Sequence, residues 1–289
     1  MTRVARFYRS RIRTRTDLVE AIGIHLVALA LAVAFMLPFF WMLSTALKTT
    51  SQVFRLPPEW IPNPINLRTF NEAWTDFVPF SRFLLNTLTI AISATVGNLI
   101  SASLVSFSFA RLTWPGRDFF FILILASLML PYHVTLIPIF ILFRTIGWIN
   151  TFLPLIVPAF FGHAFFIFFM RQFITSIPFE LDAAARIDGA STFQIFSRVI
   201  MPLCIAPLAT VAIFSFLFNW NELVRPLIYL NQEKLYTINL GMTMFRSETD
   251  VYWNHLMAIS VLAMLPPLLI FFLAQKWFIK GIAITGLKG

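Results

Sequence analysis

Long runs of hydrophobic residues, separated by short polar segments, dominate this chain of 289 residues. Six of the runs reach the roughly 20 residues that an α-helix needs to cross the hydrocarbon core of a bilayer. They lie near residues 21–46, 83–110, 119–143, 152–171, 204–230 and 256–278. Unbroken runs of this kind favour helices, which satisfy their own backbone groups in lipid, over the weakly alternating strands of a membrane barrel. The pattern therefore predicts an all-α membrane protein with six transmembrane helices.

The polar segments between these runs give the expected organisation of the chain. Five regions follow in order: a basic N-terminal arm (1–20), the first span (21–46), an external loop (47–82), a core of five spans (83–280) and a short tail (281–289). The core contains one long polar loop, residues 172–203, between the fourth predicted span (152–171) and the fifth (204–230). We found no convincing internal repeat of the kind that many secondary transporters carry.

The external loop contains a candidate amphipathic helix. Its first part, Leu56 to Pro62, is too rich in proline to be helical. Asn66 is then a candidate N-cap, and apolar residues follow at helical spacing. These apolar residues are Leu67, Phe70, Trp74 and Phe77. A short helix with this pattern would cover the outer end of the bundle or lie at the membrane interface.

The second span carries a row of small or polar residues at every fourth position. The row consists of Ala94, Asn98, Ala102, Ser106 and Ala110, and a neighbouring row consists of Ser93, Gly97 and Ser101. Small residues at this spacing let helices approach closely in lipid. We expect this broad face to contact sister helices or a second membrane subunit.

The 172–203 loop is much richer in local detail than a simple connection requires. Ser176 is a plausible N-cap, Pro178 suits a first turn, and Glu180 and Asp182 place negative charge at a positive helix end. Gly189 fits the position after a helix end, where a left-handed backbone is needed. Two short helices that meet at a glycine corner are therefore predicted.

The second of these helices begins with capping-box spacing, Ser191 with Gln194, and is expected to run to Pro202. The first helix contains three consecutive alanines, Ala183, Ala184 and Ala185. With so little side-chain bulk, the surface of another protein could approach its backbone closely. These features predict a docking element.

Composition and charge agree with a membrane location. Hydrophobic residues make up 58% of the chain, charged residues 12%, and the net charge is +9. With the N-terminus inside, most of the 22 Lys and Arg residues fall on the inner face, which predicts cytoplasmic termini and a cytoplasmic 172–203 loop. These residues are Arg3, Arg6, Arg9, Arg11, Arg13, Arg15, Arg111, Arg117, Arg171, Arg186, Arg198, Lys276, Lys280 and Lys288. Anionic lipid is their expected partner, rather than nucleic acid.

The residues that carry the loop pattern resemble a known family. From Ala183 through Gly189 to Met201 and Pro202, the loop is similar to the cytoplasmic signature of ABC importer permeases, which reads Glu-Ala-Ala, three residues, Gly, nine residues, Ile, any residue, Leu-Pro. Arg186 to Ser191 resembles the form in carbohydrate importers of the maltose-transporter type. Ala183 stands where the family usually has Glu, and Asp182 could partly replace that charge.

The resemblance implies a fold, a set of partners and a location. The fold would be that of a type I ABC importer permease, and ATP and Mg would be bound by partner ATPase subunits, with no cofactor in this chain. The partners would be a second permease subunit in a heterodimer, two ABC ATPase subunits and an extracellular or periplasmic solute-binding protein. The location would be a bacterial or archaeal cytoplasmic membrane. ATPase docking would fall on Glu180, Asp182, Ala183, Ala184, Ala185, Arg186, Asp188, Gly189, Ala190 and Ser191.

Polar residues at depth are the candidates for the solute path. Trp220, Asn221 and Glu222 form the densest cluster of such residues, and an ionisable residue within a span is a functional candidate. An aromatic face beside amide and carboxylate groups suits the binding of a sugar. This cluster also resembles the maltose-type family. In the alternative interpretation, Glu222 pairs with Arg225 and only fixes a helix end. Asn86 and Asn98 are weaker candidates, as is His133.

No residue set in the sequence predicts catalysis. The lone Cys204 can form no intrachain disulfide, and the four His residues are scattered singly. In the glycine-rich tail from Gly281, Leu287 stands where a phosphate loop has its Lys, and no Ser or Thr follows the displaced Lys288. We therefore expect a non-catalytic permease subunit of a carbohydrate importer. Two alternatives stay open: a permease for a non-sugar solute, and a secondary transporter.

Overall fold

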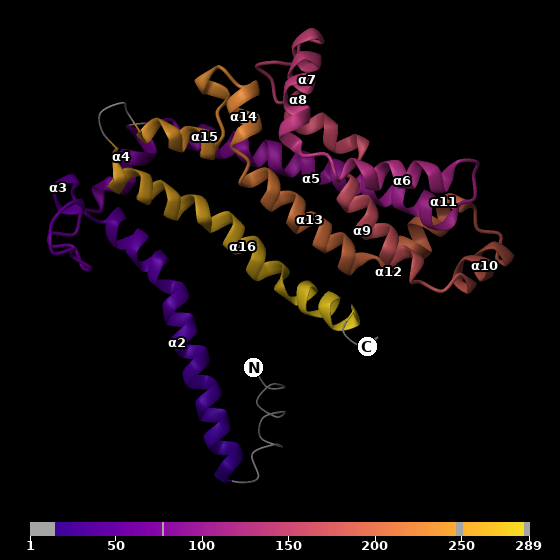
Figure 1. Cartoon of the computed structure of the whole chain (residues 1–289), viewed down its shortest axis with the longest axis horizontal. Coiled ribbons are helices and arrows are strands. Elements are labelled where there is room, and N and C mark those ends of the chain that lie inside the picture. Colours follow the sequence, from indigo (N-terminus) through magenta and orange to yellow (C-terminus); the bar gives the residue numbers. More distant parts are fainter. Residues whose placement is uncertain (1–14, 77, 247–250, 286–289) are drawn as a thin grey trace. The chain divides into compact units, whose positions relative to one another are not determined.

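In the computed structural model the part that is described, residues 15–76, 78–246 and 251–285, is mostly helical, with loops and turns between the helices. This part contains no strand, and one isolated bridge joins Arg246 to Val251. The chain divides into two compact units, residues 1–72 with 252–261 and residues 73–251 with 262–289. The long helices are α2 (Arg15–Ala46), α5 (Phe80–Arg111) and α16 (Trp253–Thr285) (Figure 1).

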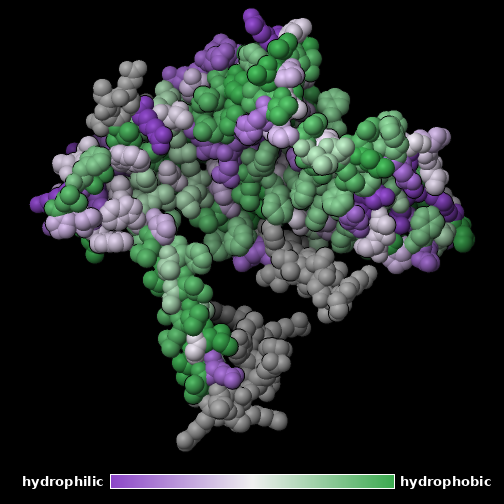
Figure 2. Space-filling view, viewed as in Figure 1, coloured by the Kyte–Doolittle hydropathy of each residue, from purple (hydrophilic) through white to green (hydrophobic). Residues whose placement is uncertain are grey.

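Among the described residues, four helical stretches are long and apolar enough to cross a membrane by themselves. They are Val19–Ala46, Phe80–Arg111, Leu153–Thr175 and Trp253–Leu273. Two further stretches meet the same criteria only as bent pairs, so the count reaches the six predicted spans if each pair is one span. Figure 2 shows the hydrophobic surface that covers α2, as expected of a helix that faces lipid.

Two predicted spans are broken, and the prediction of one continuous helix for each was wrong. Residues 119–143 form α6 (Arg117–Ser127) and α7 (Tyr132–Thr145), which are bent by 103°. Pro131 stands directly before α7, and a proline disfavours helical backbone in the residue before it. Residues 204–230 form α13 (Ile205–Trp220) and α14 (Val224–Tyr229), and α13 is also bent by 79° from the helices that precede it.

The first unit holds together through polar contacts around the end of α2. α3 (Thr50–Val53) follows α2, and Gln52 donates a hydrogen bond to the Asn63 carbonyl at 2.7 Å. The ammonium of Lys48 lies 4.2 Å from the centroid of the Trp41 ring, and burial lowers the Lys48 pKa, with Glu59 opposing the shift. The Lys48 carbonyl accepts a hydrogen bond from Asn254 at 3.2 Å.

The external amphipathic helix exists as α4 (Arg68–Thr75), but its buried face differs from the predicted one. The Asn66 side chain accepts a hydrogen bond from the Arg68 N–H at 3.1 Å, but Arg68 is the first residue of the helix, so the N-cap position falls on Leu67 and the predicted N-cap at Asn66 was one residue early. Thr69 and Ala73 are fully buried, whereas Leu67 is 70% exposed. The helix begins one residue after Leu67, which removes that residue from the apolar stripe. Phe77 lies outside the described residues.

In the second unit α5 is the central helix, packed against α9 (Ala164–Thr175) and α13 (Figure 1). Its small-residue row is buried as predicted, with Ala94, Ala102 and Ser106 at most 1% exposed. In the neighbouring row, Gly97 faces the Phe160 ring so closely that an added Cβ would lie 2.7 Å from it. Both rows of α5 therefore pack against helices of the same chain.

The remaining elements of this unit are short. They are α8 (Leu153–Ile156), η1 (Val157–Phe161), α10 (Glu180–Ile187), α11 (Thr192–Gln194), η2 (Ile195–Ile200), α12 (Met201–Leu203), η3 (Glu233–Leu235), α15 (Ile238–Met242) and η4 (Thr243–Phe245). η1, η3 and η4 are 3₁₀-helices and η2 is a π-helix.

Candidate functional site

The first helix of the 172–203 loop is α10, and it ends at the predicted glycine corner. Gly189 has φ +79°, so its backbone is left-handed. The Ala190 N–H donates to the Ala185 carbonyl at 2.9 Å, and the Gly189 N–H donates to the Arg186 carbonyl at 3.0 Å. These two bonds form a Schellman motif, which satisfies carbonyls that a helix end otherwise leaves unpaired.

The second helical segment begins at the predicted capping box. The Ser191 Oγ accepts from the Gln194 N–H at 3.3 Å, and the Ser191 N–H donates to Gln194 Oε1 at 2.7 Å. α11, η2 and α12 then continue without a gap to Leu203, close to the predicted end at Pro202. The corner between the two segments is therefore held by backbone and side-chain bonds on both sides.

The beginning of α10 differs from the sequence prediction. Ser176 is not an N-cap, because its hydroxyl donates back to the Phe173 carbonyl at 2.7 Å. The N-cap position is occupied by Phe179, whose side chain makes no capping bond, and Pro178 precedes the helix. Glu180 and Asp182 do lie in the first turn, where the helix dipole favours acidic groups.

A buried ion pair fastens this loop to α5. Arg111, the last residue of α5, has its Nε 3.2 Å from Asp182 Oδ2, and the two side chains are 5% and 2% exposed. A second guanidinium nitrogen of Arg111 donates to the Ile177 carbonyl at 2.8 Å. Asp182 is thus an internal anchor of α10 and does not offer its charge to the surface, in contrast to its predicted docking role.

The rest of the loop presents an exposed surface. Ala183, Ala184, Arg186, Asp188, Gly189 and Ser191 are exposed, as is Glu180, while Ala185 and Ala190 are half-buried. Large apolar side chains stand beside them, with Ile187 88% exposed and Phe193 68% exposed. Figure 2 shows polar residues gathered at the end of the unit that carries α10. The loop combines a buried anchor with exposed apolar tips, an arrangement suited to docking.

The predicted solute-path cluster is divided between buried and exposed positions. Trp220 is only 3% exposed, donates from Nε1 to the Ala263 carbonyl at 3.2 Å and stacks on Phe216. Its ring is packed inside the second unit, so the aromatic face expected for a sugar is not presented by Trp220. Asn221, the next residue, is exposed.

Glu222 pairs with Arg225 at a helix end, as in the alternative interpretation of the sequence. Its Oε2 accepts from Arg225 Nε at 2.8 Å, and its Oε1 accepts from the N–H groups of Val224 at 3.0 Å and Arg225 at 3.3 Å. The carboxylate therefore caps the beginning of α14. Arg225 in turn lies over the Phe218 ring, 4.9 Å from its centroid.

The weaker path candidates also have structural partners. Asn86 donates to the carbonyls of Lys234 and Tyr236 at 3.0 and 2.9 Å. Asn98 is buried and donates to the Ser215 hydroxyl at 2.9 Å, which joins α5 to α13. His133 is exposed at the start of α7.

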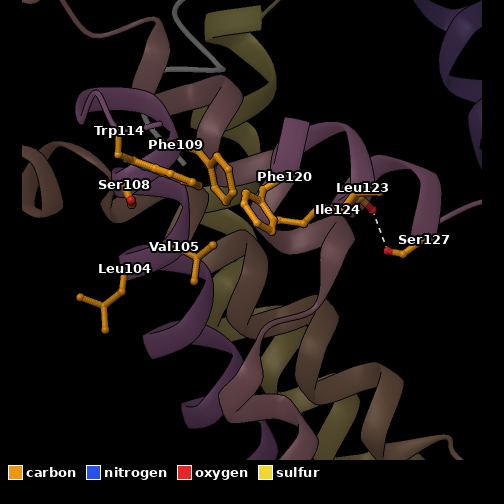
Figure 3. A pocket seen from close by; sticks show the side chains of 9 residues that line it. All are labelled: Leu104, Val105, Ser108, Phe109, Trp114, Phe120, Leu123, Ile124 and Ser127. Atoms are coloured by element: carbon orange, nitrogen blue, oxygen red, sulfur yellow. Dashed lines mark hydrogen bonds between the residues drawn. The ribbon is translucent and has the colours of Figure 1, made fainter. Parts of the chain in front are cut away.

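Two pockets in the second unit differ in chemistry. One, of about 710 Å³, lies between α5 and α6, where the side chains of Phe109, Phe120 and Ile124 point into an apolar hollow (Figure 3). None of its lining residues is charged. The other, of about 610 Å³, is lined by His163, Phe165, Phe166, Phe214, Leu217, Phe218, Asn221 and Glu222.

His163 is a pocket residue that the sequence reasoning missed. It follows Gly162, which has φ +102° and stands at the junction of η1 and α9 within the helical stretch Leu153–Thr175. An added Cβ at Gly162 would also lie 2.8 Å from Ile167. The available signal was a Gly-His pair inside an otherwise apolar run.

Within the described residues no group of three or more His, Cys, Asp or Glu residues could hold a metal ion. In the tail, α16 extends beyond the expected boundary at 280 and reaches Thr285, and residues 286–289 lie outside the described part. The basic arm, residues 1–14, also lies outside it.

The anchored loop and the spans agree with a comparison against protein families. The model of the binding-protein-dependent transport system inner membrane component matches residues 99–284. The chain therefore belongs to this family of ABC transporter permeases, and the sequence prediction of fold and family is confirmed.

Individual relatives extend over nearly the whole chain. The arabinooligosaccharides transport system permease protein AraQ of Halalkalibacterium halodurans is 32% identical, over 79% of this chain and 81% of AraQ. The sn-glycerol-3-phosphate transport system permease protein UgpE of Brucella melitensis is 30% identical, over 90% and 95%. A solved bacterial ABC transporter involved in the import of alginate has a chain of the same fold, with a TM-score of 0.79, 22% identity, and coverage of 92% and 99%.

Proposed function

We propose that this chain is a permease subunit of an ATP-driven importer, and that it takes up a carbohydrate delivered by a solute-binding protein. Family membership establishes an inner membrane component of a binding-protein-dependent transport system. The relatives that transport arabinooligosaccharides and diacetylchitobiose support a carbohydrate as the solute. The ATPase and binding-protein partners, and a second permease subunit in a heterodimer, are the remaining parts of the proposal.

The observation that carries the proposal is the anchored loop. A docking element must transmit force, and α10 is tied to the end of α5 by the buried Arg111–Asp182 pair. Ile187 at the end of α10 and Phe193 in α11 are large apolar side chains that are 88% and 68% exposed. Each ATPase subunit would bind ATP and Mg and hydrolyse the nucleotide. Closure of the ATPase pair would move α10, and α5 with it.

The membrane location and orientation belong to the same proposal. The chain would lie in a bacterial or archaeal cytoplasmic membrane with both termini and the 172–203 loop inside, because Lys and Arg concentrate on that side. The inner face would then bind anionic lipid.

A second candidate solute is a polyol phosphate, which the relative UgpE favours because its name assigns it to sn-glycerol-3-phosphate transport. Both candidates use the same docking loop and differ only in the solute. The purified solute-binding protein of the transporter separates them: titration calorimetry against oligosaccharides and glycerol 3-phosphate would show which class it binds. Binding of the phosphate alone would overturn the carbohydrate assignment.

The docking proposal is tested by purifying the tagged chain from its native membranes in mild detergent. We expect an ATPase with a phosphate loop and a second multi-span protein to co-purify. Ala184→Trp and Ile187→Asp should each release the ATPase subunit and abolish ATP-coupled uptake. Retention of the ATPase and normal uptake by both variants would overturn the docking role. Phe120→Ala, in the hollow of Figure 3, is a control in which co-purification is unchanged.

A further inference from the structure

The pocket that contains His163 is unusual because polar side chains are exposed deep within membrane-crossing segments. His163 lies directly before α9, whose 12 residues extend to the 172–203 loop. At 1.5 Å per residue, the imidazole is about 18 Å from that end of the helix, past the middle of a roughly 30 Å hydrocarbon core. The residue is exposed in the chain. A polar ring exposed to lipid at this depth is costly, so this face is suited to water or a polar ligand.

Asn221 and Glu222 add hydrogen-bonding groups to the same pocket. The Asn221 Nδ2 donates to the Leu217 carbonyl at 2.9 Å, which fixes the amide and leaves its Oδ1 as an acceptor. Glu222 is held by Arg225 and by two backbone N–H groups, so its position is also fixed. The groups are therefore preorganised, which lowers the entropic cost of binding a ligand.

Phenylalanine rings supply the apolar part of the pocket. Phe218 is 53% exposed, and Phe165 and Phe214 are each 46% exposed. The Phe218 ring lies at an edge-to-face angle to the His163 imidazole, with 6.3 Å between the centroids. Exposed aromatic rings beside a few fixed polar groups match the two surfaces of a sugar ring, its C–H face and its hydroxyl edge.

The charge of the pocket favours a neutral ligand. Glu222 and Arg225 neutralise each other at 2.8 Å, and the Arg225 guanidinium also packs over Phe218. Because the Arg225 guanidinium is paired with Glu222, it does not compensate the two negative charges of a phosphate monoester. The volume of about 610 Å³ lies within the usual range for small-ligand pockets, about 300–1,000 Å³, and accommodates one or two sugar rings.

We infer that a neutral sugar ring of the transported carbohydrate binds in this pocket, with Phe218 as the stacking platform and His163, Asn221 and Glu222 as the hydrogen-bonding groups. This assignment rests on the proposed function, because it requires the chain to be a carbohydrate permease. Trp220 has no part in it. An acyl chain is the other occupant that a membrane offers, and it would leave the imidazole, amide and carboxylate without partners.

The test uses the complete transporter, reconstituted in vesicles with its ATPases, its partner permease and its binding protein. The probe is a radiolabelled sugar chosen from arabinotriose, maltotriose and diacetylchitobiose according to what the purified binding protein retains. We expect Phe218→Ala to raise the KM of uptake about five- to tenfold, the size of effect expected for one lost aromatic contact. His163→Ala should raise it to a similar extent. Phe218→Tyr, which keeps the ring, should restore most of the affinity.

Assembly separates a binding defect from a folding defect. Each variant is first shown to co-purify with its ATPase subunits, and Phe120→Ala serves as a matched phenylalanine control outside the pocket. Unchanged KM values for Phe218→Ala and His163→Ala, in fully assembled transporters, would overturn the assignment. A pocket filled by lipid would give the same result and would likewise overturn it.

A failure of the proposed function would look different. In that case no sugar is retained by the binding protein or taken up by the unaltered transporter, while another solute such as glycerol 3-phosphate is. Uptake of a sugar by the unaltered transporter, with no response in the variants, rejects only the pocket. Uptake of the sugar with raised KM values in both variants supports both proposals.

Discussion

The pair of Arg111 and Asp182 shows how far one residue's role depends on its surroundings. Asp182 was predicted to offer negative charge on a docking surface, and the structure buries it against the last residue of α5. Asp182 therefore does not replace the charge of the Glu that the family usually has at position 183. The exposed surface of the loop instead carries small side chains, the apolar tips of Ile187 and Phe193, and the charged Glu180, Arg186 and Asp188.

Breaking this pair should destabilise the loop. Asp182→Asn leaves the Arg111 charge buried without its partner, and removing one member of a buried pair costs roughly 3–5 kcal/mol. We expect a lower unfolding temperature for the detergent-purified transporter and weaker retention of the ATPase subunit. Scanning calorimetry measures the first effect and co-purification the second.

Asp188→Asn is the matched control, because Asp188 is exposed on the same loop. Its effect on stability should stay within about 0.5 kcal/mol. Equal unfolding temperatures for the two variants would contradict the anchoring role of Asp182.

At the level of elements, the glycine corner and the close approach of helices are set by backbone geometry. Gly189 allows α10 to end in a Schellman motif before the capping box of Ser191. Gly97 allows the Phe160 ring to pack directly against the backbone of α5. Both features depend on the absence of a side chain, but for different reasons: the first is conformational and the second is steric.

Substitution of Gly189 should act through the backbone alone. An added Cβ has no atom within 4 Å, whereas the φ of +79° is strained for alanine by roughly 1–2 kcal/mol. Gly189→Ala should therefore weaken ATPase docking, and Gly189→Asn should weaken it less because Asn tolerates a left-handed backbone. Measured affinities of the ATPase subunit for the two variants would check this order, and the reverse order would contradict it.

Substitution of Gly97 should destabilise the fold through steric overlap with the Phe160 ring. The Cβ of Gly97→Ala would lie 2.7 Å from Phe160, so η1 or the ring must move, at a cost of roughly 1–3 kcal/mol. Gly23→Ala is the matched control, because nothing lies within 4 Å of the added Cβ and alanine favours a helix. Thermal unfolding should distinguish them, with a loss of stability only for Gly97→Ala.

At the level of the whole molecule, a bent helix pair connects the docking loop with the His163 pocket. The helices that cross the membrane include two bent pairs, and the second pair leads from the 172–203 loop into α13, which ends at the His163 pocket. The docking loop and the pocket are thus connected through one continuous stretch of chain. A movement of the loop would reach the pocket through these helices.

The proposed orientation predicts which loops are accessible from outside. Cys204 is the one cysteine in the sequence and is buried, so single cysteines can be introduced with low background. With Gln232→Cys, a membrane-impermeant maleimide should label intact cells. With Ile187→Cys it should label only after the membrane is opened. Labelling of Ile187→Cys in intact cells would place the docking loop outside and contradict the orientation.

Much of this architecture was predictable, because the relevant signals are local in the sequence. The length of a hydrophobic run predicts a span. The residue types and spacing of Gly189 and of the Ser191–Gln194 box predict the glycine corner and the helix start. The small-residue row of α5 was likewise predicted to be a packing face, and Ala94, Ala102 and Ser106 are buried. Local propensity and periodicity suffice for features whose partners lie within a few residues.

The tertiary structure decided the features whose partners are distant in the chain. Arg111 and Asp182 are 71 positions apart, and only the packing of α10 against the end of α5 shows that they form a pair. Trp220 is buried where its indole N–H meets the Ala263 carbonyl, 43 positions away, and the pocket lies where His163 meets Phe218 and Glu222. Side chains at such separations acquire their roles from the packing of whole helices, because burial, pairing and exposure are properties of the three-dimensional arrangement and not of the local sequence.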